Sequence, residues 1–238
     1  MAVGLEIVVD DVAGLQAAAA ARVDSIELCS ALALGALTPS AGLMRRAARC
    51  GVPVVALIRP RPGDFHYSDD ELDVMLDDIG AARAAGLSGV AIGATRADGR
   101  LDRAAMARMM AAAGDMAVTI HRAFDVTPDA DEALRDALAL GVARIMTAGH
   151  APTAAEGADR LRALVAAAAG RVAIMAGGGV TADNAAALIA TGVDALHASA
   201  SAMRPVTGPL GALRIAPERM ATDPDQIRAL QAAIDAAG

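Results

Sequence analysis

Short apolar runs alternate with Ala-rich stretches of helical length along the whole chain. The apolar runs lie at 5–9, 25–29, 52–58, 89–93, 117–121, 143–147, 171–175 and 194–198. The stretches between them include 69–85, 101–113, 129–140, 154–168 and 181–191. Strands that alternate with helices pair in parallel, because each connection crosses back over the sheet and covers it with a helix. The pattern therefore predicts a parallel sheet surrounded by helices.

About eight such units in 238 residues predict a single-domain (β/α)8 TIM barrel over 1–238. The alternative is an open, doubly wound sheet, but the glycine fingerprint that such sheets carry after their first strand is missing. We expect an irregular loop over 200–220, which could act as a lid, and a C-terminal helix over 222–237.

The charge balance limits the kinds of partner that the protein can bind. The chain has 21 basic and 28 acidic side chains, a net charge of −7, and all of its basic residues are Arg. An acidic protein lacks the basic face that nucleic acid requires, and no uncharged run is apolar enough to cross a bilayer. We expect a cytoplasmic protein without a nucleic-acid or membrane partner, because no secretory signal opens the chain. The Ala-rich outer helices favour a homodimer or a larger homo-oligomer.

Polar side chains gather where the expected strands end. In a barrel of this class the reactive groups lie on that face. The candidate catalytic residues are Glu6, Glu27, His121 and Asp125. The candidates for holding a small anionic ligand are Arg59, Asp64, Arg122, Gly177, Gly178, Gly179, His197 and Ser199. Buried charges need partners, so we expect Glu6 and Glu27 to face Arg59 and His121. The alternative is a structural ion-pair network that fills the barrel.

The glycine run 177–179 follows the seventh expected strand and leads into a helix. Glycines let backbone N–H groups approach a ligand, and a helix N-terminus favours an anion. Loops after the seventh and eighth strands often hold a phosphate in these barrels. The alternative is a tight turn that needs positive φ angles.

Cysteine spacing argues against a chelate made of two thiols. Cys29 ends the second expected strand, whereas Cys50 ends the next helix at the opposite face, about 20 Å away for a strand of six residues. Neither C-x-x-C nor H-x-x-H spacing occurs. The spacing thus argues against a high-affinity metal site, although four His near one rim could form one if the fold brings them together.

Four segments carry a resemblance to a known family: IELCSALALGALTPS, IRPRPGDFHYSDDE, HRAFD and MAGGGV, in this order. Together they resemble the copper homeostasis protein CutC family. The resemblance implies a TIM barrel, a cytoplasmic location, a role in copper homeostasis or tolerance, and copper as a cofactor. It also implies a site at the barrel mouth built from Glu6, Glu27, Arg59, Asp64, His121, Arg122, Asp125 and His197. Cys29, on the site face, is the candidate ligand for the copper that the resemblance implies. Many members have Cys where this chain has Val8, so Cys29 lacks a second thiol.

Two functions follow. In the first, a CutC-like protein serves copper homeostasis, either by binding Cu(I) weakly through Cys29 with nearby His or Met, or indirectly. In the second, a TIM-barrel enzyme acts on a small phosphorylated or carboxylated metabolite at the barrel mouth. Here arginines and the glycine run hold the anion, while Glu6, Glu27 or His121 moves protons. A scaffold without small-molecule chemistry is the third alternative.

Overall fold

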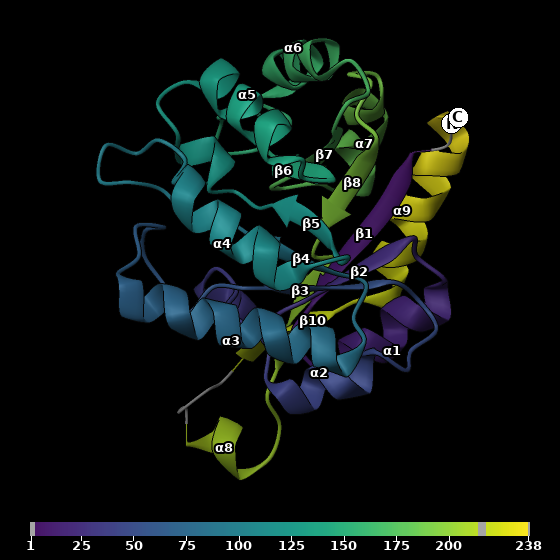
Figure 1. Ribbon diagram of the computed structural model, residues 1–238. Helices are drawn as coiled ribbons and strands as arrows, with labels where there is room; N and C mark the ends of the chain where they lie inside the picture. The colour runs from purple at the N-terminus through teal and green to yellow at the C-terminus, as the bar shows by residue number, and fades with distance from the viewer. Residues whose placement is uncertain (1–2, 214–217, 238) are drawn as a thin grey trace.

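The computed structural model describes residues 3–213 and 218–237 of the chain. Eight parallel strands close into a barrel in sequence order, and the last strand pairs with the first (Figure 1). The strands are β1 Gly4–Val9, β2 Ser25–Leu28, β3 Val54–Leu57, β4 Gly89–Ile92, β5 Ala117–Ile120, β6 Arg144–Thr147, β7 Ala173–Gly177 and β8 Ala195–Ala198. The predicted TIM barrel is confirmed.

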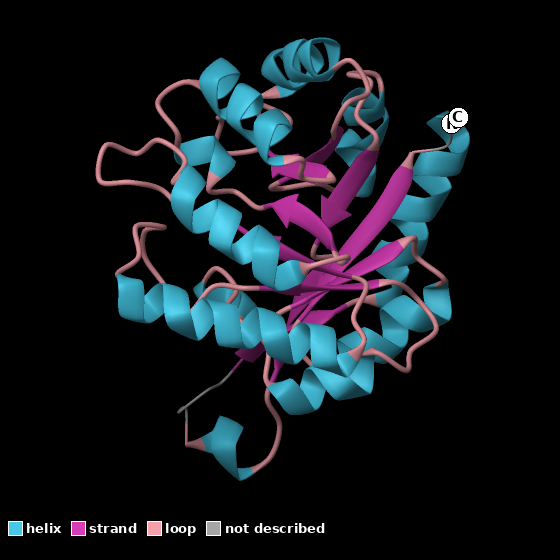
Figure 2. Cartoon of the chain, in the orientation of Figure 1, coloured by secondary structure: helices cyan, strands magenta, loops and turns pink. Residues whose placement is uncertain are grey.

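Helices surround the strands on the outside, as Figure 2 shows. They are α1 Val12–Ala21, α2 Ala41–Ala47, α3 Asp69–Ala85, α4 Arg103–Ala113, α5 Ala130–Leu140, α6 Ala158–Ala168, α7 Ala182–Ile189 and α9 Pro224–Ala237. Two 3-10 turns, η1 Leu32–Leu34 and η2 Phe124–Val126, lie in loops after strands. Helix α9 contacts both α7 and α1 and so completes the ring. No helix in the described ranges is long and apolar enough to cross a bilayer.

Successive side chains of a strand point alternately to the layer between strands and helices and to the barrel interior. In β1, Leu5, Ile7 and Val9 belong to the apolar layer between strands and helices, whereas Glu6 and Val8 occupy the barrel interior. All five side chains are at most 4% exposed. Because side chains alternate along a strand, an apolar run with one interruption places a charge inside the barrel.

Two helix starts show how local signals act. Ser68 and Glu71 form the capping box that begins α3. The expected helix over 154–168 begins only at Ala158, because Thr153 and Glu156 bond to each other in a preceding turn. At Gly157, an added Cβ would lie 1.8 Å from the carbonyl oxygen of Ala148. The missing side chain lets this turn pack onto the loop after β6.

The segment after β8 is more regular than expected. Instead of an irregular loop over 200–220, β9 Ser201–Pro205 pairs antiparallel with β10 Glu218–Thr222, and a short helix, α8 Pro209–Ala212, lies between them. Residues 214–217 of the expected loop lie outside the described residues. An ion pair of 2.8 Å between Arg219 and Asp11 ties β10 to the start of α1. Since Thr222 pairs with Ser201, the C-terminal helix begins at Pro224 rather than at 222.

Candidate active site at the carboxyl end of the barrel

A cavity of about 280 Å³ opens at the carboxyl ends of the strands. Its lining combines charged and polar groups with an apolar wall. The lining residues are Val8, Glu27, Leu32, Gly35, Ala36, Leu57, Arg59, Phe65, His121, Arg122, Met146, Gly178, Gly179, Val180, His197, Ala198 and Ser199. No described residue beyond Ser199 lines the cavity, so the described part of the β9–β10 segment does not act as a lid in this conformation.

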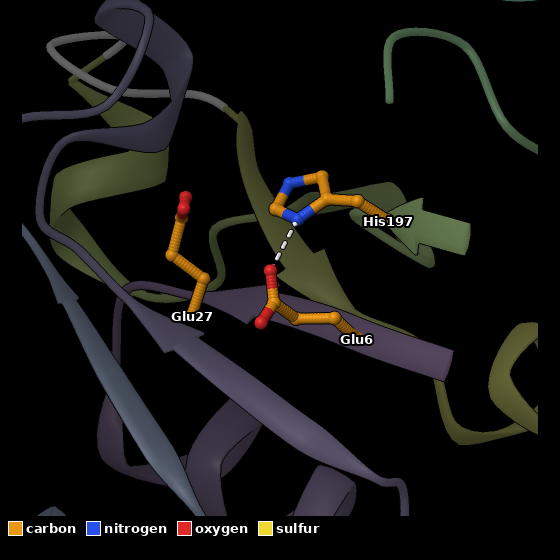
Figure 3. A group of neighbouring side chains, drawn as sticks. All are labelled: Glu6, Glu27 and His197. Carbon is orange, nitrogen blue, oxygen red and sulfur yellow. Dashed lines mark hydrogen bonds and ion pairs between the residues drawn. The ribbon is translucent and has the colours of Figure 1, made fainter. Parts of the chain in front are cut away.

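Glu6 anchors a buried polar cluster with Glu27 and His197, both of which line the cavity (Figure 3). One carboxylate oxygen of Glu6 lies 3.0 Å from Nδ1 of His197. The other accepts hydrogen bonds from Ser25 Oγ at 2.7 Å and from Arg144 Nη1 at 2.9 Å. The contact of Nδ1 with Glu6 leaves Nε2 of His197 for a ligand, since His197 itself lines the cavity.

The cluster shifts the protonation of its members. Burial acts to raise the pKa of Glu6, but its hydrogen bond with His197 and the charges of His197 and Arg144 hold that pKa below its usual value. Burial acts to lower the pKa of His197, and the charge of Glu27 together with the contact to Glu6 raises it overall. An ionised Glu6 therefore holds a His197 that gains positive charge readily.

Glu27 differs from Glu6 although both are buried carboxyl groups on neighbouring strands. Burial raises the pKa of Glu27 to about 7, and the positive charge of His197 opposes this rise. Its Oε2 atom is buried and has no hydrogen-bond partner in the described structure. A carboxyl group that changes charge near neutral pH beside a cavity is suited to proton transfer.

His121 lies on the lining at the end of β5. Its Nδ1 accepts a hydrogen bond from the backbone N–H of Ala123 at 3.1 Å. Its side chain is buried, and burial together with the charge of Arg59 lowers its pKa to about 3. The ring is therefore neutral at physiological pH. Its Nε2 has no hydrogen-bond partner among the described residues.

Arg122 also lines the cavity, and Asp125 holds its side chain. Its Nε donates to Asp125 at 2.7 Å and its Nη2 to the carbonyl of Ala151 at 3.1 Å. Asp125 also accepts from the Thr147 hydroxyl and from the backbone N–H of Ala148 and His150. Asp125 is not part of the lining, so it positions Arg122 instead of meeting a ligand.

The predicted glycine turn lies beside Arg122. Gly178 and Gly179 line the cavity with φ angles of 103° and 72°. Among the described residues, the backbone N–H groups of Gly178, Gly179 and Val180 have no protein acceptor. Gly177 has another role: an added Cβ there would lie 2.6 Å from Met146 Sδ, so this glycine makes room for a lining side chain.

The expected pairing of Glu6 and Glu27 with Arg59 differs from the structure. Arg59 donates to the carbonyl oxygens of Gly35 and Gly63 at 2.6 and 2.7 Å, and its guanidinium lies 5.1 Å from the centre of the Phe65 ring. Backbone carbonyl oxygens thus accept hydrogen bonds from both Nη atoms of Arg59, and these bonds join the loops after β2 and β3. Arg144, which the sequence analysis did not single out, holds Glu6. Arg144 lies two residues before the cavity-lining Met146 on β6, so both side chains point into the barrel. This spacing was the sequence signal that could have identified Arg144 as a partner of Glu6.

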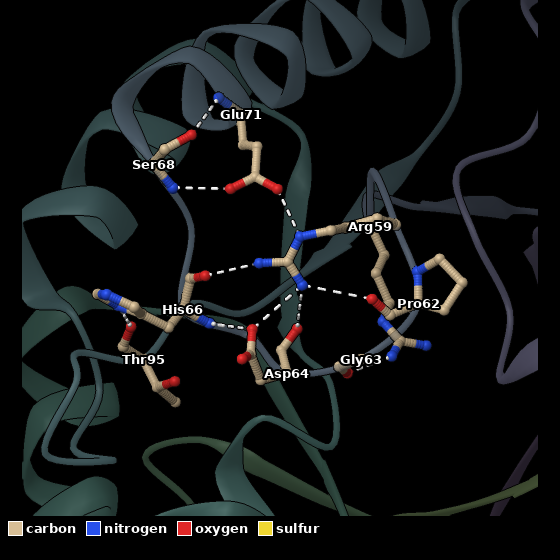
Figure 4. A network of polar contacts seen from close by, with 9 residues as sticks. Arg59, Pro62, Gly63, Asp64, His66, Ser68, Glu71 and Thr95 are labelled. Carbon is tan, nitrogen blue, oxygen red and sulfur yellow. Dashed lines mark hydrogen bonds and ion pairs between the residues drawn. The ribbon is translucent and has the colours of Figure 1, made fainter.

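Asp64 is not among the cavity-lining residues and lies instead in a network of polar contacts (Figure 4). Its side chain is 71% exposed and forms an ion pair of 3.1 Å with Arg61. Arg61 also donates to Glu71, whose carboxylate caps α3. The expected contact of Asp64 with an anionic ligand therefore has no support in this geometry, and Asp64 belongs to a surface network that orders the β3–α3 loop.

Cys29 also lies away from the lining. It is fully buried in an apolar cluster with Val8, Val55 and Leu57. Burial raises the pKa of this thiol strongly, so it stays protonated. In the part of the chain that the structure describes, the group of His, Cys, Asp and Glu side chains close enough to share a metal ion is Glu6, Glu27 and His197. Their oxygen and nitrogen donors suit divalent cations, whereas Cu(I) prefers thiol sulfur.

Fold and site together define a TIM-barrel protein with a polar, partly buried cluster at the carboxyl face of the barrel. The CutC family matches residues 3–202. The chain belongs to the CutC family.

Relatives cover nearly the whole chain. It is 48% identical over 239 residues to a CutC protein of Sinorhizobium medicae, which covers 98% of this chain and 96% of the relative. It is 53% identical over 200 residues to one of Agrobacterium fabrum, covering 84% of this chain and 80% of the relative.

Solved structures agree with the fold. The crystal structure of a protein from Streptococcus agalactiae, named for copper homeostasis and CutC, matches with a TM-score of 0.79 and 32% identity over 84% of this chain and 99% of that one. A thiamine phosphate pyrophosphorylase from Pyrococcus furiosus has a TM-score of 0.60 at 16% identity, with 99% and 96% of the two chains covered. The second likeness shows the barrel fold alone.

Proposed function

We propose that this CutC-family protein is an enzyme that binds a small phosphorylated or carboxylated metabolite at the barrel mouth and moves a proton on it. The observation that carries the proposal is the arrangement of two groups around one cavity. Arg122 and the N–H groups of the turn 178–180 line the same cavity as Glu27 and His197. One group attracts an anion, and the other exchanges protons.

The anion-binding side rests on unused donors. Asp125 and the carbonyl of Ala151 take two nitrogens of Arg122, and its Nη1 has no recorded hydrogen bond among the described residues. A Cβ on Gly178 would lie 3.0 Å from that Nη1, so the free nitrogen lies directly against the glycine turn. A guanidinium beside unpaired backbone N–H groups at the start of a helix binds phosphate or carboxylate.

The proton-transfer side rests on Glu27, with Glu6 and His197 as its surroundings. Glu6 fixes the ring of His197, and the charge of His197 keeps the pKa of Glu27 from rising further. A base is most effective when its pKa is close to the working pH. The anion in the glycine turn would hold the reacting part of the metabolite against Glu27.

Calorimetric titration with inorganic phosphate and with small carboxylates tests the anion-binding side. We expect binding that weakens on Arg122→Ala and on Gly178→Ala, whose side chain would crowd the guanidinium. Arg61→Ala is the matched control, because Arg61 is an arginine of the same face outside the cavity. Absence of phosphate and carboxylate binding, or equal loss in all three variants, would refute the proposed site.

A role in copper homeostasis is the second candidate, and family membership favours it. The name of the Streptococcus agalactiae protein, 32% identical to this chain, associates that protein with copper homeostasis. The residues fit Cu(I) poorly, because the Cys29 thiol is buried, protonated and without a second thiol. The Glu6, Glu27 and His197 donors would suit Cu(II) or another divalent ion better than Cu(I).

Competition with a Cu(I) chelator separates direct binding from an indirect role. A Cu(I) affinity that falls in Cys29→Ala would establish the thiol as a ligand. We expect the same weak affinity in Cys29→Ala as in the unsubstituted protein. A Cu(II) titration of Glu27→Gln then tests the carboxylate cluster by itself.

A cytoplasmic location and a homo-oligomeric state remain predictions. The Ala-rich outer helices support close packing between copies. Light scattering of the purified protein at several concentrations would give the number of copies.

A further inference from the structure

Three buried side-chain atoms of cavity-lining residues have no hydrogen-bond partner among the described residues: Oε2 of Glu27, Nε2 of His121 and Nε of Arg59. Arg59 is already held by backbone carbonyls through both of its Nη atoms, whereas Glu27, from β2, and His121, which follows β5, leave these atoms for a ligand. Glu27 and His121 are each 3% exposed. Most buried polar atoms of folded proteins have a hydrogen-bond partner, so three exceptions in one cavity point to groups that a ligand completes.

The backbone fixes the protonation state of His121. An N–H group can only donate, so the hydrogen bond from Ala123 makes Nδ1 an acceptor. A neutral ring with an accepting Nδ1 carries its proton on Nε2. The lowered pKa of about 3 agrees with a neutral ring. His121 therefore presents an N–H donor, and it does not act as a base at physiological pH.

The surroundings also fix the position of the ring. An added Cβ on Gly93 would lie 2.6 Å from Cε1 of His121, so only glycine leaves room for the ring there. The Phe65 ring lies against the imidazole with centroids 4.9 Å apart. A donor that is held rigidly before a ligand arrives stabilises a charge that develops on the ligand without paying for reorganisation.

We propose that the ligand of this site is a carbonyl compound with a hydrogen on the adjacent carbon, and that His121 and Glu27 together convert it to its enolate. This inference rests on the proposed function, because the anion site holds the phosphate or carboxylate end of the same molecule. A permanent N–H donor is matched to an oxygen that becomes negatively charged. An unpartnered carboxylate is matched to the proton that leaves.

The step balances within these two residues. The Glu27 carboxylate takes the proton from the carbon next to the carbonyl, and the electron pair of that C–H bond becomes the C=C bond. The C=O π pair moves to the oxygen, which accepts the hydrogen bond from Nε2 of His121. Return of a proton from Glu27 regenerates the ketone, so the step needs neither an oxidant nor a reductant.

Hydrogen–deuterium exchange in D2O tests the inference with two probes, dihydroxyacetone phosphate and pyruvate, followed by NMR. The unsubstituted protein should exchange the hydrogens next to the carbonyl of at least one probe faster than buffer does. His121→Phe keeps a ring and removes the donor, and should slow exchange by about 100-fold. His121→Gln, which restores an amide N–H, should recover part of the rate, and Glu27→Gln should abolish exchange.

The controls separate this inference from the proposed function. Calorimetric binding of inorganic phosphate should persist in all three variants, since none of them alters Arg122 or the glycine turn, and it also reports whether each variant folds. If phosphate binds and both probes exchange only at the buffer rate, the carbonyl inference is wrong and the anion site stands. An exchange rate that His121→Phe leaves unchanged overturns the role of His121. If neither phosphate nor carboxylates bind, the proposed function falls together with the inference.

Discussion

Two arginines line the same cavity and make different contacts. Arg59, after β3, donates to the backbone carbonyls of Gly35, Ala36 and Gly63 and is 9% exposed. Arg122, after β5, donates to the carboxylate of Asp125 and to the carbonyl of Ala151, and its side chain is 38% exposed. Both follow strand ends, and both looked alike in the sequence as anion ligands.

The two arginines differ in which of their N–H donors are already hydrogen-bonded to other groups of the protein. A guanidinium has five N–H donors. Both Nη atoms of Arg59 donate to carbonyl oxygens of two loops, and its Nε is buried without a partner among the described residues. Binding an anion with Arg59 would cost the contacts that hold these loops together. Arg122 can bind an anion without losing its pair with Asp125, because its Nη1 is not used by that pair. The mouth therefore has one arginine whose Nη atoms hold two loops and one whose free Nη1 supports the ligand-binding role that we propose for it.

The largest expected effect is the loss of stability in Arg59→Ala. Removing the guanidinium leaves three carbonyl oxygens short of a donor and Phe65 without its cation contact, so we expect about 4 kcal/mol of lost unfolding free energy. Urea denaturation followed by circular dichroism measures it. A variant of unchanged stability that no longer binds phosphate would reverse the roles of the two arginines.

Arg122→Ala should act on binding more than on folding. A hydrogen-bonded charge pair with an anion is worth about 2.8 kcal/mol, which corresponds to about 100-fold in affinity for phosphate. The urea midpoint should move far less than in Arg59→Ala, since Asp125 keeps its bonds to Thr147, Ala148 and His150. Calorimetry with inorganic phosphate gives the affinity. A large drop in stability without loss of affinity would contradict the comparison.

Glu27→Gln should stabilise the folded protein by an amount that depends on pH. The folded pKa of Glu27 is raised from 4.5 to about 7. The folded protein therefore holds this proton more tightly than the unfolded chain, and Glu27 lowers the stability as pH rises through that range. Glutamine stays neutral, so at pH 8 the variant should be more stable by on the order of 2 kcal/mol, and at pH 4 the difference should vanish.

Denaturation curves of both proteins at pH 4, 6 and 8 test this sign. Glu27→Asp serves as the control, because it keeps an ionisable group at the position. A stabilisation of Glu27→Gln that is the same at all three pH values would show that packing, and not the charge, is responsible.

The barrel could be predicted because its signals are local. Each strand and each helix is visible as a run or a periodicity within about ten residues, and the capping box at Ser68 and Glu71 marks the start of α3. Strand ends also gave the correct face for His121, Arg122 and His197, since parallel strands bring their carboxyl ends together.

The pairing of the side chains could not be predicted in the same way. Glu6 meets Arg144, 138 residues away, because the strand register of the closed barrel brings them together, and no local pattern encodes that register. The partners of Arg59 are backbone carbonyls, which every residue has, so the sequence could not distinguish it from Arg122. Likewise, Cys29 ends a strand on the correct face but faces an apolar cluster.

A third arginine on the same face gives the smallest expected effect and sharpens the comparison. Arg61 lies in a network as dense as that of Arg59, with Asp64, Glu71 and the carbonyl of His66 (Figure 4). Arg61 is partly exposed, Asp64 is exposed and Glu71 is half-buried, so water can replace much of the lost contacts. Arg61→Ala should therefore lower the urea midpoint several-fold less than Arg59→Ala. Salt should remove most of that small difference by screening the pairs, whereas the effect of Arg59→Ala should persist at 1 M NaCl. Equal losses in the two variants would mean that the number of contacts, and not burial, decides how much an arginine stabilises this barrel.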